Sequence, residues 1–331
     1  MGIHGGDIYR NLIEFDFSIN VNPLGMPKAV KTALYQAINQ CGKYPDARAE
    51  KLKKSVGVML NIPEEYLLFG SGASELLMAV VHGLKPKKTV IPIPSFYGYE
   101  YAAKAAESEI IYTPLSDKEN LFAALTEDTD LLFLANPNNP TGALLDKNTL
   151  KNILWHCEKN GIYVVLDECF IEFCGNRFSM LSEIEVFDHL IMLRAFTKIF
   201  AIPGVRLGYA VCKDTFLLAK IARQIPEWNL SCFAQEAGCI CALQENFIEK
   251  TERYIQKERQ FLEEGFKTKG LLAFPSRANF ILVYTERPLY HELLAQKILI
   301  RNCENFRGLH LGYYRIAVRN RKENEILLES L

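Results

Sequence analysis

Short runs of consecutive apolar residues recur along the first two thirds of the chain, separated by longer stretches with helical periodicity. The runs lie at 89–93, 109–113, 131–135, 162–166, 190–194 and 207–212. Strands that are apolar at every position, rather than at alternate ones, are typical of a sheet buried on both faces. Because these strands alternate with helices, the pattern predicts an α/β fold with a mostly parallel sheet.

The texture of the chain changes towards its C-terminal end. A helical pattern at 149–159 ends at Asn160-Gly161, and a long helix rich in Glu, Lys and Gln is predicted at 247–269. Beyond it, apolar runs at 280–284 and 314–318 predict strands of a smaller α+β unit. We therefore predict an N-terminal arm at 1–22, a large α/β domain at 23–235 and a small C-terminal domain at 236–331.

Composition narrows the function classes. The chain has 331 residues, of which 49% are hydrophobic and 23% charged, so it can bury a core and is not a disordered chain. Lys and Arg number 38 against 39 Asp and Glu, which gives a net charge of -1. This balance does not favour a nucleic-acid binder, and we predict none.

Location and metal binding are predicted from what the sequence lacks. The first residues have no cationic and apolar signal segment, and no apolar run approaches the roughly 18 residues that a membrane span needs. The nine cysteines form no CxxC and no cluster with zinc spacing, so no metal site is predicted. We expect a cytoplasmic protein with reduced thiols and no membrane contact.

Two glycine- and asparagine-rich turns are candidate ligand sites. The sequence GSGASE at 70–75 opens a predicted helix, and a helix N-terminus suits a phosphate, although ordinary capping explains such turns more often. The sequence NPNNPTG at 136–142 follows a predicted strand. It is either a plain rigid turn or a loop that orients Asn139 into the crevice where α/β sheets bind ligands.

Two charged motifs follow along the same domain. Asp167 and Glu168 end an apolar strand, where a carboxylate is either a helix cap, a surface residue or the partner of a buried cation. Lys198 ends the sequence RAFTK and precedes RLGY, which begins at Arg206. An isolated lysine is nearly always a solvated surface residue.

Together the four motifs meet the needs of one cofactor. Pyridoxal 5′-phosphate requires a lysine amine, an anion cup with an arginine, a carboxylate facing the pyridine nitrogen and a donor to the ring hydroxyl. The chain offers Lys198 as the amine, 72–74 with Arg206 as the cup, Asp167 as the carboxylate and Asn139 as the donor. In this order the motifs resemble fold type I pyridoxal-phosphate enzymes, in the branch of histidinol-phosphate aminotransferases and threonine-phosphate decarboxylases.

The resemblance implies a role for each matching residue. Lys198 would form the Schiff base with the cofactor and move the proton at the substrate Cα, while Asp167 would keep the pyridine nitrogen protonated. Asn139 would bond the ring oxygen. The cofactor phosphate would be held by Gly72, Ala73, Ser74, Thr197 and Arg206. Tyr44 would reach that phosphate from the other subunit of a homodimer, although a plain packing role for this tyrosine is equally consistent with the sequence.

The arm and the small domain point to the reaction. The arm carries HGG at 4–6 and DFSINVNPLG at 16–25, and both resemble threonine-phosphate decarboxylases of cobalamin biosynthesis. The resemblance implies a phosphorylated amino acid as substrate, with Arg315 on its carboxylate. Arg301 with His4 and Asn20 would bind its phosphate. The full set of implied substrate-binding residues is His4, Gly5, Asn20, Asn139, Arg301 and Arg315.

Phe170 separates the two branches, because aminotransferases of this group usually have a tyrosine there that bonds the ring oxygen. The implied reaction is decarboxylation of L-threonine O-3-phosphate to (R)-1-aminopropan-2-yl phosphate. The alternative is transamination of histidinol phosphate in histidine biosynthesis. A transcription regulator with this fold is not expected, because three residues before His4 leave no room for a DNA-binding module.

Overall fold

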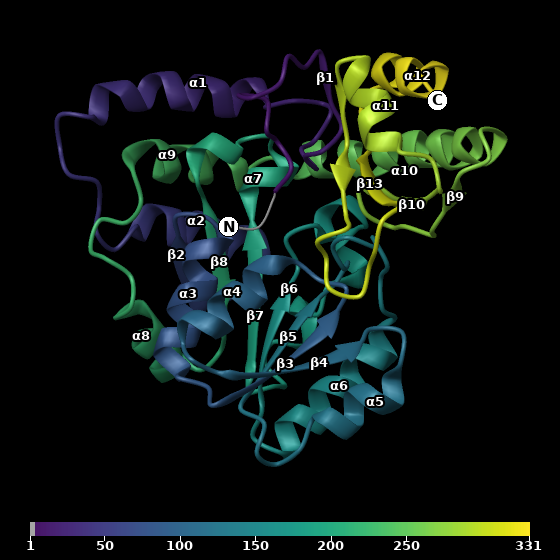
Figure 1. Cartoon of the computed structure of the whole chain (residues 1–331). Coiled ribbons are helices and arrows are strands. Elements are labelled where there is room, and N and C mark those ends of the chain that lie inside the picture. The colour runs from purple at the N-terminus through teal and green to yellow at the C-terminus, as the bar shows by residue number, and fades with distance from the viewer. Residues whose placement is uncertain (1–3) are drawn as a thin grey trace.

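A seven-stranded sheet forms the centre of the larger part of the computed structural model, which describes residues 4–331 (Figure 1). Its strand order is β2-β8-β7-β6-β5-β3-β4. The bounds are β2 Leu67–Gly70, β3 Lys88–Ile93, β4 Glu109–Pro114, β5 Leu131–Ala135, β6 Tyr163–Asp167, β7 Leu190–Ala195 and β8 Gly208–Val211. The predicted strands are β3 to β8, each within one residue at either end, and the predicted α/β class is confirmed. The sequence pattern missed β2.

Neighbouring strands run parallel from β4 across to β7, whereas β8 is antiparallel to both β7 and β2. Along β5, Leu131 and Phe133 pack into one core cluster while Leu132 and Leu134 pack into another. The first cluster includes α3 (Ala73–Leu84), α4 (Tyr97–Ala105) and α8 (Thr215–Ala222), and the second includes α5 (Lys118–Ala124) and α6 (Lys147–Lys159). Burial on both faces explains why these strands are apolar at every position.

A smaller antiparallel sheet follows in the C-terminal part. Within the described chain it has four strands in the order β12-β13-β10-β9. Their bounds are β9 Leu272–Ala273, β10 Phe280–Tyr284, β12 Arg301–Asn302 and β13 Tyr313–Ala317. The helices of this part are α10 Glu245–Thr268, α11 Leu289–Ala295 and α12 Arg321–Glu329.

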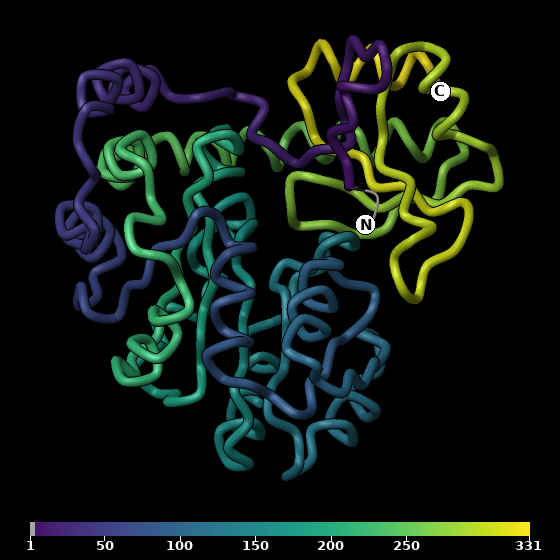
Figure 2. Tube along the Cα trace, turned by 60° about the vertical axis from the view of Figure 1, so that its left-hand side comes forward, coloured from purple at the N-terminus to yellow at the C-terminus, as the bar shows by residue number. Residues whose placement is uncertain are grey.

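The N-terminal arm lies against the small sheet rather than the large one (Figure 2). β1 (Phe15–Asp16) pairs in parallel with β11 (Ile298–Leu299). The Phe17 N–H donates to the Leu299 carbonyl at 2.7 Å, and the Ala317 N–H donates to the Phe17 carbonyl at 2.9 Å. The two ends of the sequence are therefore built into one unit.

Four further helices and six 3-10 turns complete the elements of the described residues. They are α1 Lys28–Ala37, α2 Glu50–Leu60, α7 Phe196–Ile199 and α9 Cys232–Cys241, with short 3-10 turns η1 Ile38–Gln40, η2 Glu64–Tyr66, η3 Ile171–Phe173, η4 Asn176–Phe178, η5 Leu181–Glu183 and η6 Pro203–Val205. Helices α1 and α2 both pack on α9. No helix among residues 4–331 is both long and apolar enough to cross a membrane.

Candidate active site

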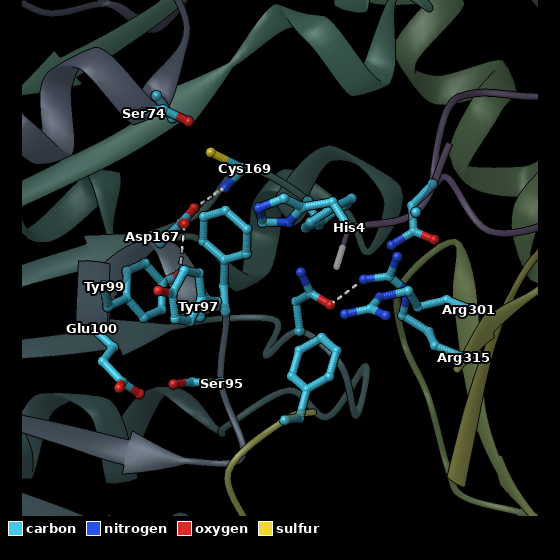
Figure 3. Close-up of a pocket in the computed structure, with 18 of the residues that line it drawn as sticks. His4, Ser74, Ser95, Tyr97, Tyr99, Glu100, Asp167, Cys169, Arg301 and Arg315 are labelled. Atoms are coloured by element: carbon cyan, nitrogen blue, oxygen red, sulfur yellow. Dashed lines mark hydrogen bonds between the residues drawn. The ribbon is translucent and has the colours of Figure 1, made fainter. Parts of the chain in front are cut away.

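A cavity of about 580 Å³ lies between the large sheet, the small domain and the arm. The carboxyl ends of three strands, β5, β6 and β7, meet at this cavity. Their last residues, Ala135, Asp167 and Ala195, line the cavity wall. This is the edge at which parallel α/β sheets bind ligands. Figure 3 shows Asp167 on the large-sheet side of the cavity and Arg301 and Arg315 on the small-domain side.

Lys198 lies on α7, a single helical turn that begins directly after β7. Its side chain lines the cavity. Removal of the amine from bulk water lowers its pKa, and the cationic Arg315 and Arg206 lower it further. A lowered pKa leaves more of the amine unprotonated near neutral pH, which is the form that attacks a carbonyl group.

Asp167 is the last residue of β6, and its side chain is buried at the cavity wall. Its Oδ2 accepts a hydrogen bond from the Tyr99 hydroxyl at 2.6 Å, and its Oδ1 accepts one from the Cys169 N–H at 2.9 Å. The next residue, Glu168, points elsewhere and pairs with the buried Arg194, at 2.8 Å from Nη2 to Oε2. The carboxylate that faces the cavity is therefore that of Asp167, whereas Glu168 neutralises a core cation.

An anion cradle lies where α3 begins. Its first residue, Ala73, follows the N-cap residue Gly72, which has no side chain to cap the helix, and the Ser71 N–H just before it donates to Glu75 Oε2 at 2.6 Å. Ala73, Ser74 and Thr197 line the cavity beside the Arg206 guanidinium. Gly72 has a φ of +83°, and a Cβ there would lie 2.5 Å from Arg206 Nη2. The close approach of backbone and guanidinium thus requires glycine and creates a positive pocket.

These groups fit pyridoxal 5′-phosphate. An uncapped helix N-terminus with Arg206 suits its phosphate, the Lys198 amine suits its carbonyl carbon, and the Asp167 carboxylate suits its ring nitrogen. A Cβ at Gly72 would meet the Arg206 guanidinium, so the absence of a side chain there lets the backbone of this turn pack against that cation.

Arg315 lies on β13, is buried, and stands over the Phe280 ring at 5.4 Å. Its Nη1 donates to Asn139 Oδ1 and its Nη2 donates to the Ser18 carbonyl at 2.9 Å. Burial lowers the pKa of its guanidinium to about 10. Because Arg315 occupies the Asn139 carbonyl oxygen, the NH₂ group is what Asn139 has left to offer a ligand.

Arg301, on β12, is the second buried guanidinium at the cavity. It donates to the Asn302 carbonyl at 2.6 Å and to Asn305 Oδ1 at 2.7 Å, and it lies over the Phe306 ring at 5.1 Å. Within residues 4–331, neither Arg301 nor Arg315 forms an ion pair with a carboxylate. The small-domain side of the cavity therefore carries two buried guanidiniums that no carboxylate of residues 4–331 meets in an ion pair.

The arm supplies His4, Gly5 and Asn20 to the same cavity. Burial lowers the pKa of the His4 imidazole, and Arg301 and Arg315 lower it further. A Cβ on Gly5 would lie 2.3 Å from the Ser18 carbonyl oxygen, so only glycine lets the arm pack this closely. In the described chain, the buried Oδ1 of Asn20 has no hydrogen-bond partner.

Tyr44 lies outside the cavity of its own chain, with 83% of its surface exposed, and its ring packs on Trp228 at a centroid distance of 5.1 Å. The proposed reach into a second subunit therefore stays a prediction. Every other residue expected in the site either lines the cavity or, in the case of Gly72, adjoins Arg206 at its edge.

Several cavity residues were missed by sequence reasoning, and three of them contact charged groups of the site. Tyr99 donates a hydrogen bond to Asp167, the Ser18 carbonyl accepts one from Arg315, and Arg307 pairs at 3.3 Å with Glu100, which also lines the cavity. The aromatic run at 96–101, which follows β3, is a signal that could have pointed to Tyr99. Ser18 acts through its backbone carbonyl, so its side-chain type gave no hint.

Phe170 also lines the cavity, and its ring packs edge-on against Phe280 at 5.1 Å. A phenylalanine offers no hydroxyl to a cofactor oxygen. Its contact with Phe280, which in turn lies under Arg315, adds an apolar wall beside the buried guanidinium.

The sequence model of the aminotransferase class I and II family matches residues 13–331. The threonine-phosphate decarboxylase of Salmonella typhimurium is 36% identical over 96% of this chain and 90% of its own length. The solved structure of the histidinol-phosphate aminotransferase from Clostridium acetobutylicum has a TM-score of 0.91 and 34% identity, and covers 96% of this chain and 98% of that one.

A solved histidinol-phosphate aminotransferase from Sinorhizobium meliloti, in complex with pyridoxal 5′-phosphate, shares the fold with a TM-score of 0.90 at 20% identity, over 99% of this chain and 94% of that one. The family match also supports pyridoxal 5′-phosphate as the cofactor, and the predicted resemblance to pyridoxal-phosphate enzymes is confirmed. The chain belongs to the class I and II aminotransferase family.

Proposed function

We propose that this protein uses pyridoxal 5′-phosphate to decarboxylate L-threonine O-3-phosphate, giving (R)-1-aminopropan-2-yl phosphate and CO₂ in cobalamin biosynthesis. The observation that carries the proposal is the pair of buried guanidiniums, Arg301 and Arg315, which the described chain leaves without an acidic partner. A substrate with both a carboxylate and a phosphate would neutralise them. Similarity to the Salmonella typhimurium decarboxylase supports the same substrate.

Arg315 would bind the carboxylate of the substrate. Its guanidinium lines the same cavity as Lys198, and its cationic charge contributes to the lowered pKa of the Lys198 amine. The planar fork of an arginine matches the two oxygens of a carboxylate, so Arg315 fixes the direction of the bond that breaks. The hydrogen bonds to Asn139 and to the Ser18 carbonyl hold that fork in place.

Arg301, His4 and Asn20 would take the phosphate. Arg301 and His4 supply N–H donors, and the side-chain NH₂ of Asn20 supplies another. Phe306 under Arg301 keeps water from one face of the guanidinium, which strengthens its attraction to an anion.

The chemistry replaces the bond between Cα and the carboxylate with a C–H bond at the same carbon. Pyridoxal 5′-phosphate, when bound, accepts the electron pair that the departing CO₂ leaves behind. Asp167 holds the proton on the ring nitrogen, and the Lys198 amine delivers the proton to Cα. Phe170 supports decarboxylation over transamination, because the aminotransferases of this group usually place a tyrosine there.

The experiment that tests the proposal identifies the products that the enzyme forms from two candidate substrates. The purified enzyme is incubated with L-threonine O-3-phosphate labelled with ¹³C in the carboxylate, and separately with histidinol phosphate plus 2-oxoglutarate. Release of labelled CO₂ with aminopropanol phosphate is expected. Serine O-phosphate serves as the matched control for the methyl group, worth roughly 10- to 200-fold in a specific pocket. Rapid transamination of histidinol phosphate without CO₂ release would overturn the proposal.

A homodimer in the cytoplasm completes the proposal. Tyr44, Tyr35 and Ile38 are large apolar residues exposed near α1, and together with Trp228 they supply a surface for a second copy. Such a copy would bring Tyr44 towards the cofactor phosphate of its partner.

A further inference from the structure

Tyr99 contributes a hydrogen bond to the reaction centre that the mechanism above does not use. It lies on α4, in the large domain, while Asp167 ends β6. The hydroxyl donates to Asp167 Oδ2 at 2.6 Å, and both side chains are buried (Figure 3). A short bond to a carboxylate inside a protein is among the stronger hydrogen bonds, because charge and low dielectric reinforce each other.

The Tyr99 ring is fixed on two sides. It stacks on Phe133 of β5 at a centroid distance of 5.2 Å and an interplanar angle of 9°, and it meets the Phe96 ring edge-on at 5.6 Å. Phe133 lies on β5, which is paired on both sides, with β3 and with β6. The hydroxyl is therefore aimed by packing rather than free to rotate away.

The second oxygen of Asp167 is also held, by the Cys169 N–H at 2.9 Å. The carboxylate thus receives one donor on each oxygen, which fixes its plane and stabilises its anionic form. An anionic carboxylate is what a protonated pyridine nitrogen requires as its partner. Burial and the nearby Asp167 charge raise the pKa of Tyr99 well above its ordinary value, so the hydroxyl remains a donor throughout the working pH range.

We propose that Tyr99 is a positioning residue that holds the Asp167 carboxylate in its ionised form and orientation, and thereby keeps the cofactor's ring nitrogen protonated. The inference rests on the proposed binding of pyridoxal 5′-phosphate, but it is independent of which bond at Cα is broken. No bond is made or broken at Tyr99 itself.

The experiment compares the holoenzyme with Tyr99→Phe, which removes one oxygen atom and keeps the ring stack. The protein is loaded with pyridoxal 5′-phosphate labelled with ¹⁵N in the ring, and the nitrogen resonance reports the protonation of that nitrogen. In Tyr99→Phe we expect the resonance to move towards the neutral-pyridine position. Cofactor affinity, from fluorescence titration of the apoprotein, should fall about 10-fold or more. An unchanged resonance and affinity in the folded variant would overturn the proposal.

Two further variants make the test specific. Tyr101→Phe, on the same helix but exposed, is the matched control and should leave both readouts unchanged. In an Asp167→Asn background, Tyr99→Phe should have no further effect on affinity, because the residue acts through Asp167. Additive losses in the double variant would contradict that route.

A further variant tests the proposal even if Tyr99→Phe fails to fold. A fluorinated tyrosine placed at position 99 is nearly isosteric, makes the hydroxyl a stronger donor and should keep the nitrogen resonance at the protonated position, in contrast to Tyr99→Phe. Movement towards the neutral-pyridine position in this variant would contradict the proposal. If the wild-type protein binds no pyridoxal 5′-phosphate, the proposed function fails as well. If it binds the cofactor but the Tyr99 variants behave as wild type, only this inference fails.

Discussion

Burying a guanidinium without a carboxylate beside it is costly, and Arg315 carries that cost in a pKa that burial lowers to about 10. Arg301 has a lowered pKa for the same reason. Proteins keep such groups where a ligand supplies the missing charge. At the residue scale, the two arginines without a carboxylate partner therefore mark the side of the cavity where we propose that the anionic groups of the substrate bind.

Arg301→Ala should raise KM for threonine O-phosphate by about 10- to 150-fold, the range for a lost charge-assisted hydrogen bond, and change kcat much less. The contact is made equally before and during the chemical step, which is why KM bears the loss. Steady-state kinetics check this, with Arg287→Ala, an exposed arginine of the same domain, as the control. A fall in kcat at constant KM would contradict a phosphate-binding role.

His4 gives a pH prediction. Burial, Arg301 and Arg315 lower the pKa of its imidazole, so the ring is neutral at pH 7 and becomes cationic only below its ordinary value of about 6.5. The cationic ring attracts the substrate phosphate more strongly. The ratio of KM in His4→Asn to KM in wild type should therefore stay constant above pH 7 and rise in the acidic range.

Taking a ratio cancels the protonation of the substrate phosphate itself, since both enzymes meet the same substrate. A ratio that already changes above pH 7, or that stays flat down to pH 5, would show that the His4 charge does not act on the phosphate.

At the scale of elements, the ends of strands and the starts of helices position the residues that we propose to hold the cofactor. β6 and β7 end at Asp167 and Ala195, and α3 begins beside Arg206. Helix α6 has a side-chain cap, because Asp146 accepts from the Thr149 N–H, whereas among the described helices α3 shares an uncapped start with α1, α2, α4, α7, α10 and α11. What distinguishes α3 is that its first residues line the cavity together with Arg206.

Gly72→Ala should weaken cofactor binding about 10-fold or more. The new Cβ would collide with the Arg206 guanidinium, and alanine is strained at a φ of +83°, at a cost of about 1–3 kcal/mol. Titration of the apoprotein with pyridoxal 5′-phosphate measures the effect. Gly204→Ala is the control, because a Cβ there meets no described atom within 4 Å. Equal affinity in the two variants would remove Gly72 from the cradle.

The sequence predicted the elements of the large sheet well because burial on both faces leaves a clear apolar signal. It missed β2, β1 and β11, which are short and gain their stability from partners far along the chain. The same distinction holds in the site. Lys198 and Asp167 lie in recognisable motifs, whereas the bond from Tyr99 to Asp167 joins positions 68 residues apart and depends on packing that only the fold reveals.

At the scale of the whole molecule, the proposed dimer assigns Tyr44 and Lys198 of each site to different chains. Lys198→Ala and Tyr44→Ala should each be severely impaired alone. Mixed dimers, formed by unfolding and refolding the two variants together, should regain activity through one intact site. Activity assays of tagged, purified heterodimers check this.

The control pairs Lys198→Ala with Asp167→Asn, whose residues lie in one chain at one cavity. That mixture should regain nothing. Recovery there, or its absence with Tyr44→Ala, would contradict a site that Tyr44 shares across the interface.

Because β1 pairs with β11, the N-terminal arm can reach its final structure only after the C-terminal part of the chain has been synthesised. Domains generally begin to fold while the chain is still being synthesised. All residues of strands β2 to β8, and all residues of this chain that we propose to hold the cofactor, have been synthesised once Val211 has been added. The arm is synthesised first, but its partner strand exists only after Ile298 and Leu299 have been added. The residues proposed to hold the cofactor therefore precede Arg301 and Arg315 in the order of synthesis, and the small-domain part of the site proposed to select the substrate is the last to be made.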